Sequence, residues 1–86
     1  MSYSVRISES AANEIELLPK AEIPKIFSKI ERLSLNPRPP GCKRLVGLPE
    51  KLWRIRSGNY RIIYTIDDGI KIVEVRGVGD RKDIYK

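Results

Sequence analysis

The second half of this chain alternates apolar and polar residues with a period of two, and this pattern constrains the fold most strongly. The alternation runs through Leu52–Arg56, Tyr60–Ile66 and Ile70–Val78, as is typical of strands that bury one face. The two joints, Ser57-Gly58-Asn59 and Asp67-Asp68-Gly69, contain residues that tolerate positive φ, which tight hairpins need. The sequence therefore predicts a three-stranded antiparallel meander.

The first half of the chain predicts one more strand and two helices. Residues 2–7 alternate in the same way and indicate a strand. Ser8 is suited to cap a helix that Pro19 stops. Apolar residues then recur at helical spacing over Ile23–Leu33, until Asn36 and the proline after it end the run. These two helices are expected to form a helical hairpin.

The order of these elements defines the expected fold class. Residues 36–50 are rich in Pro and Gly and keep neither period, so we expect an irregular connection over the surface. The order β-α-α-β-β-β predicts an α+β fold, with a small, mostly antiparallel, twisted sheet and a helical hairpin on one face. A chain of 86 residues has room for one core, and we expect a single domain over residues 1–86.

The charge of the chain favours an anionic partner. Lys and Arg number 17 against 11 Asp and Glu, a net charge of +6. Residues 43–86 hold eleven of the basic and six of the acidic side chains, so the excess lies in the second half. Such a balance promotes association with a polyanion or an acidic protein.

Composition also excludes several classes of site. With no His and one Cys, the usual zinc and iron ligand sets are not available, so we expect no metal and no cofactor. No apolar run approaches the ~20 residues that cross a bilayer, and the first residues lack the apolar segment of a signal peptide. We expect a cytosolic protein without a membrane partner.

Alternation separates the arginines of the meander from its apolar residues. Trp53 and Ile55 are expected to share the core with Ile62 and Tyr64, because alternate side chains of a strand point to the same face. The opposite face is then open and basic, and the segment after the last strand is expected to reach its rim. The residues predicted to gather there are Arg54, Arg56, Arg61, Arg81 and Tyr85.

A basic patch with a neighbouring aromatic residue has a chemical use on RNA. The 2′-hydroxyl of RNA attacks the adjacent phosphate once it is aligned and the developing charge is stabilised, and guanidinium groups provide fixed donors for that charge. Arg remains protonated, so it does not serve as the general base. The base is then sought among Tyr85, Lys82, Lys51 and Lys43, or the reaction proceeds without one.

Two stretches of the sequence resemble a known family. These stretches are LWRIRSGNYRIIY at residues 52–64 and VGDRKDIY at residues 78–85. With the connector words NP at 36–37 and KRLVGL at 43–48, they resemble the RelE/ParE superfamily of bacterial and archaeal toxins over essentially the whole chain. YRIIY and GDRKDIY are similar to the RelE branch, whose members cleave messenger RNA in the ribosomal A site.

The resemblance implies roles for individual residues. Arg61 and Arg81 match the pair that grips the phosphate and stabilises charge, with Arg81 also a candidate proton donor, and Tyr85 matches the tyrosine that orients the nucleotide. Leu52 and Arg54 stand where well-studied RelE toxins carry lysines, which leaves the general base unassigned. The predicted RNA-binding residues are Arg54, Arg56, Lys43, Lys51 and Lys82.

The resemblance also implies partners and leaves several functions open. The implied partners are a cognate RelB-like antitoxin, the ribosome and messenger RNA, with no small-molecule cofactor. A ribosome-dependent endoribonuclease, a ParE-like inhibitor of DNA gyrase without enzymatic activity, and an inactive RNA-binding remnant all fit the same fold.

Alternative structural interpretations also exist for single residues. Arg61 is placed to pair across a hairpin with Glu74, and Tyr85 is placed to anchor the tail. A helical stripe of basic residues is most often a solvated face. That stripe consists of Lys25, Lys29 and Arg32.

Overall fold

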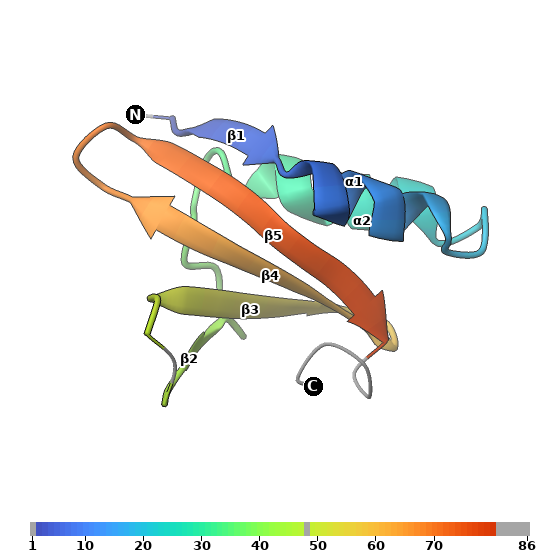
Figure 1. Ribbon diagram of the computed structural model, residues 1–86. Helices are drawn as coiled ribbons and strands as arrows, with labels where there is room; N and C mark the ends of the chain where they lie inside the picture. The colour runs from blue at the N-terminus through green and yellow to red at the C-terminus, as the bar shows by residue number, and fades with distance from the viewer. Residues whose placement is uncertain (1, 48, 81–86) are drawn as a thin grey trace.

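A computed structural model describes residues 2–47 and 49–80 of the chain (Figure 1). The elements of this part are β1 (Ser4–Ile7), α1 (Glu9–Glu16), α2 (Ile23–Arg32), β2 (Lys43–Leu45), β3 (Leu52–Ser57), β4 (Tyr60–Asp67) and β5 (Ile72–Asp80). They confirm the predicted α+β class, a mostly antiparallel sheet with a helical hairpin on one face. Within the described residues, no helix has both the length and the apolar character needed to cross a membrane.

The described strands form one five-stranded sheet in the order β1-β5-β4-β3-β2. Strands β3, β4 and β5 pair antiparallel as successive neighbours, so the predicted meander is confirmed. β1 runs parallel to β5 along the far edge, and Figure 1 shows it leading directly into α1. The sheet therefore has β1 at one edge and β2 at the other.

The helices begin where the sequence signals predict. The Oγ of Ser8 accepts a hydrogen bond of 3.1 Å from the backbone N–H of Ala11, which caps α1. Pro24 lies in the first turn of α2, where its missing N–H leaves no bond unmade. Both helices turn their apolar stripes onto the same face of the sheet. The buried cluster that results comprises Ala11, Ile15, Ile26, Ile30, Leu33, Ile55, Ile62, Tyr64, Val73, Val75 and Val78.

A bulge in β5 keeps its valines in this core. Val75 and Val78 are both buried although they are three residues apart, and strict alternation would put them on opposite faces. The register shifts beside Ile63, so Arg76 is inserted as an extra residue between the two. β1 pairs with β5 only as far as Val75. Further along β5, the backbone N–H of Val78 donates a 3.0 Å hydrogen bond to the Glu14 carboxylate, which connects α1 to β5.

The predicted connection over residues 36–50 is wrong in one part. Lys43–Leu45 forms the short strand β2, which pairs antiparallel with Leu52–Arg54. Three residues are too few to produce a recognisable period, so this strand depends on the partner edge that β3 offers.

Several element ends also differ from the predictions. α1 ends at Glu16 and α2 at Arg32, each a few residues before the proline or asparagine signal. β5 begins at Ile72 instead of Ile70, since the turn continues through Lys71, whose φ is 57°.

The start of the connector is held by hydrogen bonds and an ion pair. The buried Tyr64 hydroxyl donates to the Pro37 carbonyl at 2.7 Å. The Arg38 guanidinium donates to both carboxylate oxygens of Asp68, at 3.2 and 2.9 Å. Tyr3 donates to the same carboxylate at 2.6 Å. Arg38 also lies over the ring of Trp53. We call this set the connector clasp, and its members are Tyr3, Pro37, Arg38, Trp53, Tyr64 and Asp68.

Candidate nucleic-acid interface

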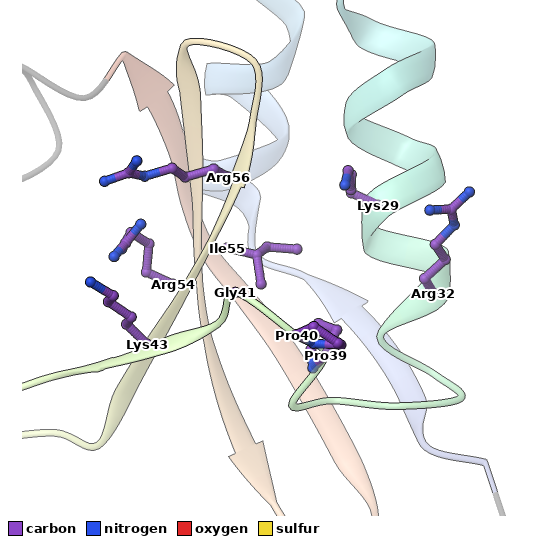
Figure 2. Close-up of a pocket in the computed structure, with 9 residues that line it drawn as sticks. All are labelled: Lys29, Arg32, Pro39, Pro40, Gly41, Lys43, Arg54, Ile55 and Arg56. Carbon is purple, nitrogen blue, oxygen red and sulfur yellow. The ribbon is translucent and has the colours of Figure 1, made fainter.

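Two cross-strand pairs of cations lie side by side on the sheet face away from the helices. Arg56 stands opposite Arg61 between β3 and β4, and Lys43 stands opposite Arg54 between β2 and β3. Directly opposed residues share a face, and Arg54 and Arg56 are two apart, so both pairs share it. In Figure 2, Lys43, Arg54 and Arg56 point to one side of β3, and Ile55 points to the other. We call Lys43, Arg54, Arg56 and Arg61 the basic face.

The basic face sets two pairs of like charges opposite each other. Like charges directly opposite one another destabilise a sheet. Lys43 and Arg56 are exposed and Arg61 is half-buried, whereas Arg54 is only 6% exposed. Arg54 therefore lies on the predicted face, but the expectation that it is open to solvent is wrong. Repulsion between charges at a buried site is screened less than at the surface. A bound anion would relieve this repulsion, which suits the basic face to phosphate groups.

Arg56 and Arg61 line a small hollow beside the β3–β4 turn. The hollow has a volume of about 40 Å³ and is lined by Arg56, Gly58, Asn59, Tyr60 and Arg61. Gly58 has a φ of 60°, which permits the tight turn that sets the two arginines opposite each other. A water molecule occupies about 30 Å³ of liquid. The hollow is therefore of a size to receive one small group rather than a base.

A larger groove of about 460 Å³ crosses the outer edge of β3 next to α2 (Figure 2). Cations lie on both of its sides, from β2 and β3 on one and from α2 on the other. Pro39, Pro40 and Ile55 add apolar surface, and none of the described lining residues is acidic. We call this the edge groove. Its basic residues are Lys29, Arg32, Lys43, Arg54 and Arg56.

The shifted pKa values belong to the connector clasp. Hydrogen bonds from Arg38 and then from Tyr3 lower the pKa of Asp68 to about 2. The hydrogen bond with Asp68 in turn raises the pKa of Arg38. Burial raises the pKa of the Tyr64 hydroxyl far above its ordinary value. Arg38 also lies 5.0 Å from the centre of the Trp53 ring, within cation–π range. The clasp thus holds its ionic groups in their charged forms.

Among the other predicted site residues, the structure describes only Lys51. Lys51 is exposed just before β3, about 16 Å along the strand from Arg56 at roughly 3.3 Å per residue. Arg81, Lys82 and Tyr85 lie outside the described residues. The last described residue, Asp80, pairs with Tyr60, the neighbour of Arg61. The described chain therefore ends beside the first arginine pair.

Two of the alternative interpretations are tested by the structure. The pairing of Arg61 with Glu74 is wrong, because Arg61 stands opposite Gly79 and Glu74 stands opposite Thr65. Lys29 and Arg32 are exposed, as a solvated helix face would be, yet both line the edge groove. This proximity was not predicted from the sequence. Their spacing on one helix face was visible, but nothing in the sequence related that face to β3.

The family comparison agrees with this geometry. The family model for the ParE toxin of the type II toxin–antitoxin system, parDE, matches residues 5–85 of the chain. The chain belongs to the RelE/ParE toxin superfamily. The toxin resemblance drawn from the sequence is thus confirmed.

Individual members of the superfamily resemble this toxin along its length. Toxin RelE of Mycobacterium tuberculosis is 33% identical over 89 residues, which cover 98% of this chain and 87% of that one. The crystal structure of the archaeal RelE–RelB complex from Pyrococcus horikoshii has a TM-score of 0.82 at 26% identity, covering 96% and 99% of the two chains.

A second solved complex gives the same result. For RelBE2 from M. tuberculosis the TM-score is 0.84 at 27% identity, over 94% of this chain and all of that one (100%). These relatives make the chain a RelE-type toxin of a toxin–antitoxin system.

Proposed function

We propose that this toxin is an endoribonuclease that cleaves messenger RNA in the ribosomal A site. The observation that carries the proposal is the basic face, where Arg56 opposes Arg61 and Lys43 opposes Arg54. Guanidinium groups fixed on neighbouring strands bind phosphate oxygens through paired donors. They stabilise a phosphodiester most when its negative charge increases, which is the requirement for catalysis.

The proposed reaction is an internal transfer within the RNA. The 2′-oxygen forms a bond to the adjacent phosphorus while the bond from phosphorus to the 5′-oxygen breaks, leaving a 2′,3′-cyclic phosphate and a 5′-hydroxyl. Arg61 and Arg56 hold the non-bridging oxygens, Arg81 gives a proton to the leaving 5′-oxygen, and Tyr85 orients the nucleotide. The nucleophile belongs to the substrate, so the mechanism requires no metal-bound water.

The proton of the 2′-hydroxyl passes to a water molecule, because the roles assigned above include no general base. Of the described lysines among the candidates, Lys43 shares the basic face and Lys51 does not. Arg54 stands where the family resemblance implies a lysine, and its guanidinium provides donors for phosphate. We therefore assign the ribosome a large part of the catalysis, through alignment of the 2′-oxygen with the phosphorus. Free RNA is expected to be cut poorly.

A comparison of two arginine variants tests this function. Arg61→Gln should slow messenger cleavage on translating ribosomes by roughly 10²–10³-fold, the usual loss when one donor to developing charge is removed. Arg6→Gln is the matched control, because Arg6 is exposed on β1 at the opposite edge of the sheet. The ends of the messenger are mapped, and their 2′,3′-cyclic phosphates are detected chemically. Intact messenger with the unchanged toxin, or equal cutting by Arg61→Gln, excludes the proposal.

Inhibition of DNA gyrase is the second candidate function. The matching family model carries the ParE name, and the fold serves both kinds of toxin, so fold alone does not separate them. A supercoiling assay with stoichiometric toxin distinguishes the two. Blocked supercoiling together with intact messenger favours the gyrase inhibitor, and the opposite result favours the endoribonuclease.

We also propose that a cognate antitoxin of the RelB type neutralises this toxin. The support is that the two structural relatives described above were solved as a RelE–RelB complex and as the complex RelBE2, and that a basic face of this kind attracts an acidic partner. Growth arrest on expression, relieved by coexpression of the antitoxin gene, is the expected result.

A further inference from the structure

We propose that Glu14 is a positioning residue for the cleavage reaction, because its carboxylate holds the end of β5 in place against Arg61. The proposal rests on the proposed endoribonuclease function. It adds to the residues assigned there a side chain from α1, which is not part of the basic face.

The first observation is that the last part of β5 lacks a neighbouring strand on one side. β1 pairs with β5 only over residues 72–75, whereas β5 continues to Asp80. Within residues 2–47 and 49–80, no other strand pairs with β5 on that side, and α1 takes the place of β1 there (Figure 1). The backbone N–H of Val78 donates to Glu14 Oε1 at 3.0 Å. A helix side chain thus supplies the acceptor that a strand supplies elsewhere in the sheet.

The second observation is that this stretch of β5 has little stiffness of its own. Gly77 and Gly79 flank Val78, and glycine in a strand has the most backbone freedom to lose and no side chain to pack. Glu14 Oε1 lies so close to Gly77 that a Cβ added there would be 3.4 Å from it. The carboxylate therefore lies against the backbone as well as accepting the hydrogen bond, and it restricts a segment that the glycines leave loose.

The third observation connects this segment to the reacting groups. Successive residues of an antiparallel strand turn their N–H and C=O groups to opposite sides. The N–H of Val78 faces Glu14, so the backbone groups of Gly79 face β4. There Gly79 stands opposite Arg61, and Arg81 follows Gly79 by two residues in the sequence. Two of the arginines assigned to the reaction are thus attached to the segment that Glu14 fixes, one across the sheet and one along the chain.

A purely structural role for Glu14 is the competing interpretation. Such a role would lower the stability of the toxin and leave cutting unchanged well below the unfolding temperature. A positioning role acts on the rate instead, because a small misplacement of a group that stabilises developing charge slows the reaction steeply. The maximal rate of cleavage therefore separates the two interpretations.

The experiment measures messenger cleavage on programmed ribosomes with the full-length toxin in excess. The maximal rate and the half-saturating toxin concentration are then obtained separately. Glu14→Ala removes the acceptor and should lower the maximal rate about tenfold, with less than about a twofold change in the half-saturating concentration. Glu14→Gln keeps an oxygen of the same reach and should retain at least about half of the maximal rate. Glu16→Ala, the matched control at another exposed position of α1, should change neither quantity by more than about twofold.

Two further measurements report on β5 itself. In ¹⁵N-labelled toxin, Glu14→Ala should speed hydrogen exchange at the Val78 amide about tenfold, because that amide loses its acceptor. Adding Gly77→Ala to Glu14→Ala should recover at least about threefold in the maximal rate, since alanine has fewer backbone conformations than glycine and replaces part of the lost restraint. The backbone of Gly77 is outside the left-handed region, so alanine is compatible with it.

Three results would overturn this proposal and keep the endoribonuclease. An unchanged maximal rate for Glu14→Ala, with faster exchange at Val78, would leave the hydrogen bond a structural role only. A loss confined to the half-saturating concentration would make Glu14 part of ribosome or messenger binding. A loss in Glu14→Gln as large as in Glu14→Ala would assign the effect to the charge of Glu14. If the unchanged toxin leaves messenger intact, the endoribonuclease proposal and this one fail together, so the unchanged toxin distinguishes the two failures.

Discussion

The connector clasp and the basic face are built from the same kinds of residue but have opposite electrostatics. In the clasp, Arg38 donates to both oxygens of Asp68, and Tyr3 adds a third hydrogen bond to that carboxylate. On the basic face, Arg56 stands opposite Arg61. The clasp compensates its charges within the chain, whereas the basic face sets like charges against each other.

This difference separates a cation that is tied to a carboxylate within the fold from cations placed side by side, where one anionic ligand would contact more than one of them. Charges compensated within the chain add to stability and leave little for a ligand. Opposed cations reduce stability, and natural proteins retain such an arrangement mainly where function requires it. Changes in the clasp should therefore reduce stability and spare activity, and changes on the basic face should do the reverse.

The largest effect on stability is expected inside the clasp. Tyr64→Phe should lower the free energy of unfolding by about 1–3 kcal/mol, because it leaves the buried Pro37 carbonyl without the Tyr64 donor. Urea denaturation measures the loss. Tyr60→Phe, a half-buried tyrosine on the same strand, is the control and should change the free energy by less than about 0.5 kcal/mol.

Activity completes this test of the comparison. Well below the unfolding temperature, Tyr64→Phe should cut messenger at close to the unchanged rate, because the Tyr64 side chain lies in the core under the helices and the basic face is on the opposite side of the sheet. Equal destabilisation by both tyrosine variants, or a large loss of cutting in Tyr64→Phe alone, would contradict the separation of the two regions.

Regions held by interactions between residues close in sequence were predicted well, and regions held by contacts between distant residues were not. The meander and the Ser8 cap depend on periods and local hydrogen bonds, so they were readable directly. β2 and the Arg76 bulge were missed, since a three-residue strand and a one-residue insertion leave almost no periodic signal.

The site was predicted unevenly for the same reason. Alternation alone placed Arg54, Arg56 and Arg61 on one face, as the structure has them. The approach of Lys29 and Arg32 to β3 depends on how a helix packs against a sheet edge, which sequence patterns do not encode. The clasp was not foreseen, because its ion pair joins positions 30 residues apart.

A smaller effect, of opposite sign, is expected on the basic face. Arg56→Gln should raise the free energy of unfolding by about 0.2–1 kcal/mol at low salt, since it removes the charge opposite Arg61. The gain should shrink at 0.5 M salt, where the Debye length falls to a few ångströms. Arg56→Lys retains the charge and should show little gain. Messenger cutting should fall in Arg56→Gln. If Arg56→Gln is instead less stable than the unchanged toxin, Arg56 supports the fold and the prediction is wrong.

The smallest effect is expected from the exposed ion pair of the clasp, and it should depend on pH. The pKa of Asp68 is lowered from 3.8 to about 2 in the folded chain, so its contribution to stability is complete above the ordinary pKa and is lost as the pH falls toward 2. The unfolding temperature of Asp68→Asn should therefore lie slightly below that of the unchanged toxin at pH 7, and the two should converge near pH 2. Glu16→Gln, an exposed change on α1, controls for general loss of negative charge.

The emission of Trp53, the single tryptophan of the chain, reports the protonation of Asp68 as well, because protonated Asp68 releases the Arg38 guanidinium that lies over the indole. A constant difference in unfolding temperature from pH 7 to pH 2 would mean that the clasp holds the connector by packing and the Tyr64 hydrogen bond, without help from its charges.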